Sequence, residues 1–351
     1  MKTILFVTMA ASVAFSQSAD SDWRAHNDAG MALVNQLRFA DAEQEFRGAL
    51  AVAQQFPEND LRLSTSISRL AMVREQRGDF PGAEKLYRQV LELRERTLAA
   101  GDPLIADALV RLAAELQSCA RYKEADPLLR RAVALDEAAH DDARTADALN
   151  GLGLTLAGRG ETARAEPVLR RSRELLVKTK GEDSFEVARV SNSIATNEAL
   201  LREFGKAETE LRRALPVFER VLGPESPTLA AVLNNAFAVI SAQNRFADAE
   251  PFLDRAVKIM DKTPVTSPQM LCVRSNQASF EAEAGNLSQS ARIFEQVIPV
   301  EERMLGSNHP QVARTLQVYS KVLREMHRKA EARQAQMRAS AILKSFHQKK
   351  T

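Results

Sequence analysis

Apolar residues recur every three to four positions along most of this chain, and no stretch shows a sustained alternation of apolar and polar residues. Ala83, Leu86, Tyr87 and Val90 share one face of a predicted helix, and the preceding segment 67–73 has the same spacing. The pattern therefore predicts an all-α protein built from pairs of amphipathic helices. The first helix of each pair is called helix A below, and the second is called helix B.

The helical pattern is periodic. One small residue, called the marker residue below, occupies the same point of helix B in each copy and recurs every 40 to 42 residues. The marker residues are Ala42, Ala83, Ala125, Ala165, Ala207, Ala249, Ser290 and Ala332, and the first six are followed by an acidic residue. The predicted repeats are 23–56, 60–99, 102–139, 142–180, 184–222, 226–262, 267–305 and 309–347. They leave no room for another domain, so we predict a single solenoid over residues 17–351.

Small residues also recur at two positions where helices A and B would touch. Twelve residues before the marker stand Gly30, Ala71, Ala113, Gly153, Ala195, Ala278 and Ser320, and seven after it stand mostly Ala, Val or Ser. Small residues on facing helices allow the two axes to approach closely. The sixth repeat has Phe237 at this position, next to Ala236 where a large residue is usual. We interpret this as an exchange of volume between neighbours in the core.

The segment LGPESPTLA, residues 222–230, combines turn-forming residues with a helix start. The position of its serine, 23 residues before the marker, recurs along the chain as Asp60, Asp102, Asp142, Ser184, Ser226, Ser267 and His309. Most of these side chains are good helix N-caps, and proline follows several of them. Each such loop is therefore predicted to end helix B of one repeat and to cap helix A of the next.

The pattern resembles the tetratricopeptide repeat (TPR) family. The family has Leu-Gly on helix A, and on helix B an Ala, a large apolar residue and a second Ala. Segments 149–156 (LNGLGLTL) and 165–172 (AEPVLRRS) match it, except that Ser172 replaces the second Ala. The 42-residue length and the loop LGSNHPQVA, residues 305–313, resemble the kinesin-light-chain subclass. The resemblance implies a right-handed α-solenoid of about eight helix-turn-helix repeats, with helix A lining the concave side.

Polar side chains recur on helix A. Fifteen residues before the marker, the position is held mostly by asparagine or another small polar residue, and basic residues or asparagine lie next to it or one turn earlier. The candidate groove residues are Asn27, Arg69, Arg111, Asn150, Arg189, Asn192, Asn234, Asn235, Asn276 and Arg314. In the family, equivalent asparagines bond the backbone of an extended peptide. Alternatively, the amides bond neighbouring helices and the arginines are solvated.

Composition excludes several functions. The 48 basic and 46 acidic residues give a net charge of +2, which supplies no argument for binding nucleic acid. The five histidines are scattered, and neither a His-x-x-x-His or Cys-x-x-Cys pair nor a Gly-x-Ser-x-Gly elbow occurs. We therefore predict no enzyme, no metal site and no cofactor. Cys119 and Cys272 are interpreted as buried small residues rather than as a disulfide.

The first sixteen residues, MKTILFVTMAASVAFS, differ from the rest of the chain. A basic start, an apolar stretch and small residues at Ala14 and Ser16 are typical of a cleaved secretory signal peptide. A membrane anchor is the alternative, but the apolar run is shorter than the ~20 residues that span a bilayer. We expect an exported protein, periplasmic or secreted and of bacterial type, with no membrane insertion after cleavage.

Two functions remain open at this point. The first is a scaffold whose concave groove binds a peptide or a segment of a partner protein. The second is a structural component of a cell-envelope complex that uses the convex face or the end repeats. The sequence leaves the partner and the oligomeric state open.

Overall fold

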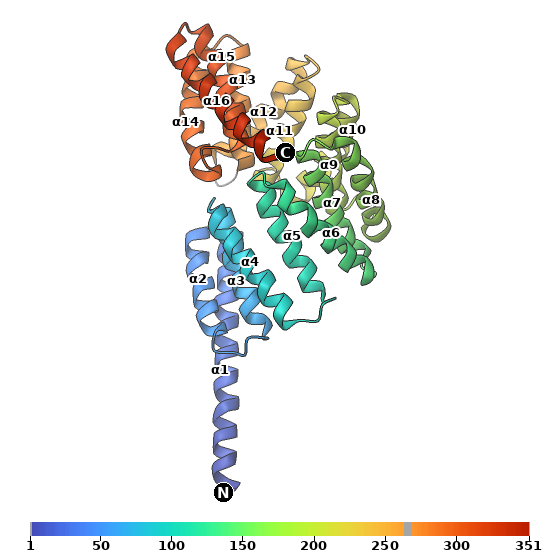
Figure 1. Ribbon diagram of the computed structural model, residues 1–351, viewed down its shortest axis with the longest axis vertical. Helices are drawn as coiled ribbons and strands as arrows, with labels where there is room; N and C mark the ends of the chain where they lie inside the picture. Colours follow the sequence, from blue (N-terminus) through green and yellow to red (C-terminus); the bar gives the residue numbers. More distant parts are fainter. Residues whose placement is uncertain (1, 263–267, 351) are drawn as a thin grey trace. The chain divides into compact units, whose positions relative to one another are not determined.

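The computed structural model describes residues 2–262 and 268–350, with side chains described over 18–262 and 271–346. Within this part of the chain all regular structure is helical, in sixteen helices without a strand (Figure 1). The helices are α1 (Lys2–Asn35), α2 (Phe39–Ala53), α3 (Leu61–Gln76), α4 (Phe80–Thr97), α5 (Pro103–Ser118), α6 (Tyr122–Ala138), α7 (Asp142–Gly158), α8 (Thr162–Lys180), α9 (Phe185–Leu200), α10 (Phe204–Leu222), α11 (Pro227–Ser241), α12 (Phe246–Asp261), α13 (Pro268–Glu283), α14 (Leu287–Leu305), α15 (Pro310–Glu325) and α16 (Lys329–Lys350).

Odd-numbered helices correspond to helix A and even-numbered helices to helix B. Neighbouring helices pack against each other along the chain, as in α7 with α8, α8 with α9, and α15 with α16. The chain forms two compact units, residues 1–115 and 116–351, and the boundary between them falls within α5. The all-helical prediction is confirmed, and each unit is a stack of helical hairpins.

The small residues lie at helix contacts, as predicted. All eight marker residues are buried, and so are the small residues on the A helices. At Gly153 a Cβ atom would lie 2.4 Å from Cδ2 of Leu169, so α7 and α8 approach too closely for a larger side chain. Close packing of helices A and B is therefore confirmed.

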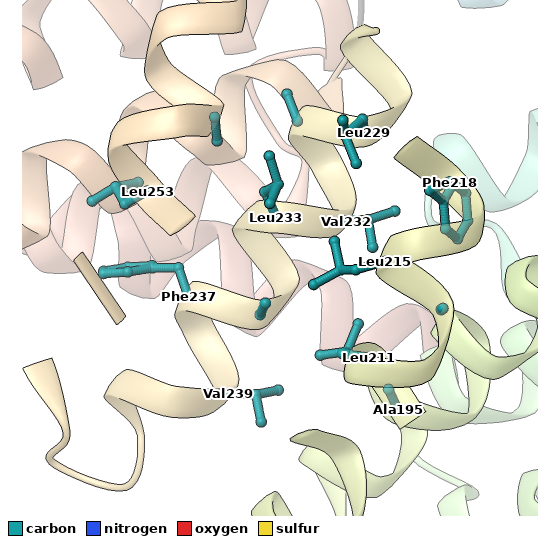
Figure 2. Close-up of a cluster of buried hydrophobic side chains, with 14 of the residues drawn as sticks. Ala195, Leu211, Leu215, Phe218, Leu229, Val232, Leu233, Phe237, Val239 and Leu253 are labelled. Carbon is teal, nitrogen blue, oxygen red and sulfur yellow. The ribbon is translucent and has the colours of Figure 1, made fainter. Parts of the chain in front are cut away.

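The largest part of the core of the second unit is formed by α9 to α12, and Figure 2 shows Leu215 of α10 beside Val232 of α11 in this cluster. Phe237 and Ala236 are both buried there. The Phe237 ring meets the ring of Phe280 edge to face, with centroids 6.0 Å apart. Phe237 is thus a core residue, in agreement with the predicted exchange of volume.

Most of the predicted helix caps are present. Asp60 accepts a hydrogen bond from the backbone N–H of Arg62 at 2.9 Å, and Asp102 accepts one from the N–H of Leu104 at 2.8 Å. The remaining caps that act through their side chains are Ser184 and His309. These bonds satisfy N–H groups that have no partner inside the helix.

One predicted cap is displaced. Asp141 caps α7 by accepting from the N–H of Arg144 at 2.9 Å, whereas Asp142 is the first helical residue. The loop between α6 and α7 consists of the three residues 139–141, so α7 already begins at Asp142 and the residue before it takes the cap position. Ser226 occupies the N-cap of α11 but makes no side-chain cap bond, and Ser267 lies outside the described residues.

Two further findings bear on the sequence predictions. Cys119 and Cys272 form no disulfide, as predicted, but both are only partly buried, so the prediction that they are fully buried small residues is wrong. None of the helices in the described part of the chain is long and apolar enough to cross a bilayer. The continuous helix α1 includes the predicted cleavage point after Ser16, and cleavage there stays a prediction.

Candidate functional site

Two of the candidate groove residues, Arg69 and Arg111, line one small cavity in the first unit. It has a volume of about 150 Å³ and is bordered by three neighbouring helices, α3, α4 and α5. Its lining residues are Thr65, Ser68, Arg69, Met72, Arg94, Asp107 and Arg111. The repeat spacing places Arg69 and Arg111 at equivalent points of successive A helices, which brings the two guanidinium groups to the same cavity.

Positive charge exceeds negative charge around this cavity. Arg94 Nη1 donates to Asp107 Oδ2 at 2.9 Å, and Arg111 Nε donates to Asp107 Oδ1 at 3.0 Å. Burial alone would raise the pKa of Asp107, but Arg111 and Arg94 hold it below its ordinary value. Arg69 forms no ion pair with any described residue, and burial together with the charge of Arg111 lowers its pKa. Two of the three guanidinium groups thus bond the carboxylate of Asp107, and the third, Arg69, has no carboxylate partner among the described residues.

A pair of carboxyl groups that the sequence analysis missed lies close by. Tyr87 Oη donates to Glu75 Oε2 at 3.2 Å, and burial raises the pKa of Glu75. Glu115 is 1% exposed, and neither of its oxygens has a hydrogen-bond partner in the described structure. Burial and the charge of Glu75 raise the pKa of Glu115 to about 8, so this carboxyl group is largely protonated at neutral pH.

The next junction has a neutral pair at the corresponding positions. Gln117 and Thr155 occupy the positions that correspond to Glu75 and Glu115, one repeat further along. There Gln117 Nε2 donates to Thr155 Oγ1 at 2.6 Å. In the sequence, Glu75 and Glu115 stand at the two positions where a hydrogen bond can join adjacent A helices. Two acidic residues at these positions could have predicted the close pair of carboxyl groups.

Four of the candidate asparagines bond one another across repeats. Asn235 Nδ2 donates to Asn192 Oδ1 at 3.0 Å, which joins α11 to α9. Asn276 Nδ2 donates to Asn234 Oδ1 at 2.8 Å, which joins α13 to α11. The structure thus contains a bond between neighbouring helices for each of these four amides, and binding of a peptide by them stays a prediction. Each amide keeps a second polar atom that has no partner among the described residues.

The two remaining asparagines are not tied to a neighbouring repeat. Asn150 is buried and its Oδ1 atom has no partner in the described structure. Asn27 Nδ2 donates to Asp28 Oδ1 at 3.1 Å, while its own Oδ1 is buried without a partner. These two amide oxygens are acceptors that the described part of the protein does not use.

The last two candidates, Arg189 and Arg314, make local contacts. Arg189 forms an ion pair with Asp147 of the preceding A helix. Arg314 Nη2 donates to Gln311 Oε1 at 2.7 Å, within its own helix. Arg189 is therefore paired within the chain, and Arg314 is exposed on α15, where its charge acts on the carboxyl of Glu301.

The acidic residue after the marker also acquires a role that the sequence analysis did not assign. In three repeats it forms an ion pair with an arginine in the A–B turn of the next repeat, 33 to 37 residues further along. The pairs are Glu43 with Arg77, Asp126 with Arg159, and Glu208 with Arg245. Adjacent repeats are thus linked by charge as well as by apolar contact.

Metal-ligating side chains do not converge in the part of the chain described by the structure, where no group of three or more His, Cys, Asp or Glu could hold an ion. The site therefore offers guanidinium and amide groups, which bind anions and peptide backbone.

Comparison with known families gives one match. The family model described as tetratricopeptide repeat matches residues 24–96, 104–176, 186–262 and 269–345, which is most of the chain. A search of curated proteins finds no match.

Several solved structures are similar. BtubC (BKLC) from P. vanneervenii is 27% identical, with 65% of this chain and 91% of that chain covered and a TM-score of 0.50. A Rap protein complexed with Competence and Sporulation Factor is 11% identical, with 93% and 99% covered and a TM-score of 0.66. A Rap conjugation gene regulator of the plasmid pLS20, in complex with the Phr* peptide, is 10% identical, with 94% and 96% covered and a TM-score of 0.61. The last two show likeness of fold alone.

Proposed function

The chain belongs to the tetratricopeptide repeat family, and on that premise we propose that it is a non-enzymatic scaffold that binds an extended segment of a partner protein along its A helices. Within the family we place it in the 42-residue, kinesin-light-chain-like subclass. The observation that carries the proposal is the cavity at Arg69 and Arg111, which three guanidinium groups line and where the carboxylate of Asp107 bonds only two of them, Arg94 and Arg111.

The chemistry of this cavity favours an acidic group on the partner. Arg69 is half-buried and has no carboxylate partner among the described residues. A guanidinium group binds a carboxylate with two parallel hydrogen bonds, and such charge-assisted bonds are stronger than neutral ones. An Asp or Glu side chain of the bound segment would supply the missing negative charge.

Within the second unit, four amides suit the backbone of an extended peptide. Asn192, Asn234, Asn235 and Asn276 each use one polar atom for a bond between repeats and keep the other. An amide held in position by one bond loses little entropy when it makes a second. The two Rap structures are complexes with a factor and with a peptide. We extend peptide binding from them to this chain as part of the proposal.

The proposal can be tested with an array of immobilised ten-residue peptides in matched pairs, one with a central Asp and one with Asn. We expect the full chain to prefer the Asp member of some pairs. Arg69→Gln should remove that preference, because it deletes the uncompensated cation. The control is Arg88→Gln, which changes an exposed arginine of α4 that is paired with Glu84. Equal binding by the two variants, or no preference for Asp, would refute the proposal.

We also propose that residues 1–16 direct export and are removed. The proposal rests on the sequence pattern of this segment, with its basic start, its apolar stretch and the small residues Ala14 and Ser16. Expression of the full chain in a bacterium with a periplasm should yield a product whose N-terminus is Gln17, as measured by mass spectrometry of the fractions. An intact N-terminus in the cytoplasmic fraction would contradict it.

A further inference from the structure

The second unit contains a larger cavity that none of the ten candidate groove residues lines. Its volume is about 690 Å³, within the range of pockets that hold small molecules. Four segments line it. They are residues 119–124, which lead into α6, residues Arg159 and Glu161 in the turn between α7 and α8, the loop 305–310, and Ser345 and Phe346 of α16. Segments distant in the sequence therefore form one concave site.

Part of the wall is apolar and aromatic. Tyr122, Leu305, Pro310 and Phe346 contribute rings and aliphatic groups to the lining. The Tyr122 ring lies against α7 at Gly158, where a Cβ atom would come within 2.5 Å of ring carbons. The absence of a side chain at Gly158 thus positions this ring at the cavity. Such a wall favours a ligand with an apolar body.

The charged groups of the lining are not equivalent. Arg121 Nη2 donates to Glu124 Oε2 at 2.6 Å, and Arg159 Nη2 lies 2.7 Å from Glu161 Oε1. These two cations are neutralised by their neighbours. Lys123 also lines the cavity but forms no ion pair with any of the described side chains. Its ammonium group is the cation available to a ligand.

His309 supplies a second donor. Its Nδ1 atom accepts the backbone N–H of Gln311 at 3.1 Å and so caps α15. Burial, together with the charge of Arg314, lowers the pKa of His309 to about 4, so the ring is neutral at physiological pH. A neutral ring whose Nδ1 accepts must carry its proton on Nε2. This Nε2 is buried and completes no hydrogen bond of good geometry with a described residue, although the backbone of Ser118 lies close enough to the ring to oppose the fall in its pKa.

We propose that this cavity binds a small organic anion with an aromatic or otherwise apolar body. Lys123 and the Nε2–H of His309 bind the anionic group, and Tyr122 and Phe346 contact the body. The site is independent of the proposed groove, since no residue is shared between them. It would make the scaffold responsive to a low-molecular-weight ligand.

The test uses the fluorescent probe 8-anilinonaphthalene-1-sulfonate and its uncharged analogue N-phenyl-1-naphthylamine, titrated into the full chain. We expect saturable binding of the sulfonate, and weaker binding of the uncharged analogue. Lys123→Met should weaken sulfonate binding by about fivefold, as expected for loss of one partly exposed ion pair. His309→Asn retains a cap acceptor but removes the ring N–H, and should also weaken binding.

The matched control is Lys85→Met, which removes an exposed lysine of α4 that is remote in sequence from the cavity. Melting temperatures of all variants establish that each is folded. Weaker sulfonate binding by Lys123→Met or His309→Asn, with Lys85→Met unchanged, supports the proposal. Equal binding by all three variants, or equal affinity for the charged and uncharged probes, overturns it. Neither result depends on whether the groove binds a peptide.

Discussion

Asn276 donates its side-chain amide to the amide oxygen of Asn234 at 2.8 Å and thereby ties α13 to α11. Asn235 and Asn192 make the same bond one repeat earlier. In both cases the donor lies fourteen residues before its marker, and the acceptor lies fifteen residues before the marker of the preceding repeat. The asparagine pattern is thus a ladder between A helices, with one rung at each of these junctions.

Replacing Asn234 by Ala should destabilise the protein by about 1–2 kcal/mol, because Asn234 is buried and the amide of Asn276 loses its acceptor. The measurement is urea unfolding followed by circular dichroism. Asn59→Ala, at an exposed loop position, serves as the control and should change stability little. A loss no larger than that of the control would show that the rung contributes nothing measurable.

The ladder can be extended by one rung. Ser193 occupies the donor position opposite Asn150, but its hydroxyl donates to the backbone oxygen of Arg189 at 3.3 Å, which leaves Asn150 Oδ1 without a partner. Ser193→Asn should therefore stabilise the protein by about 1 kcal/mol. The same change in an Asn150→Ala background should give no gain. Equal effects in the two backgrounds would mean that the new amide does not reach Asn150.

Gly153 tests the contact between helices A and B. Gly153→Ala should cost about 2 kcal/mol or more, because the new methyl group would overlap the buried side chain of Leu169. Gly205→Ala is the matched control, since nothing lies within 4 Å of its added Cβ. That change should stabilise α10 by about 0.5–1 kcal/mol through lower entropy of the unfolded chain. Thermal melts of both variants give the comparison, and effects of the same sign would contradict it.

The buried carboxyl of Glu115 predicts a pH dependence. Its pKa is raised from 4.5 in the unfolded chain to about 8 in the folded protein, so folding favours its protonated form. Stability from this group is complete below pH 4.5 and is lost as the pH rises toward 8. The groups that act on it are Glu75, Glu84 and Asp79, each of which disfavours its ionisation.

Glu115→Gln replaces the carboxyl group by an amide of the same shape that cannot ionise. The stability of this variant should therefore fall less between pH 5 and pH 8 than that of the unchanged protein. At pH 8 the variant should be the more stable of the two. Urea unfolding at a series of pH values measures both, with Glu92→Gln, an exposed change on α4, as the control. Parallel pH profiles for Glu115→Gln and the unchanged protein would show that Glu115 does not titrate in this range.

The fold could be predicted almost entirely from the sequence, because the patterns that specify it lie within short segments and recur in every repeat. The spacing of apolar residues identifies amphipathic helices, the marker residues give the period, and most caps lie where the loops place them. The one displaced cap, at Asp141 instead of Asp142, reflects the short loop between α6 and α7, after which the helix begins one residue earlier than predicted. Local errors of this size do not alter a fold in which each repeat packs mainly on its neighbours.

The candidate site could be predicted only in part. Periodicity correctly selects the helix A positions of the asparagines, but it leaves open whether an amide faces a ligand or the next helix. That choice depends on the angle and distance between adjacent A helices, which bring Asn235 within 3.0 Å of Asn192. Likewise, Glu75 and Glu115 are ordinary acidic residues in the sequence, and only burial between helices shifts their protonation. Helix formation depends on residues that are close together in the sequence. The hydrogen-bond partner of an asparagine and the protonation of a buried carboxyl group depend on residues about forty positions away, which packing brings together.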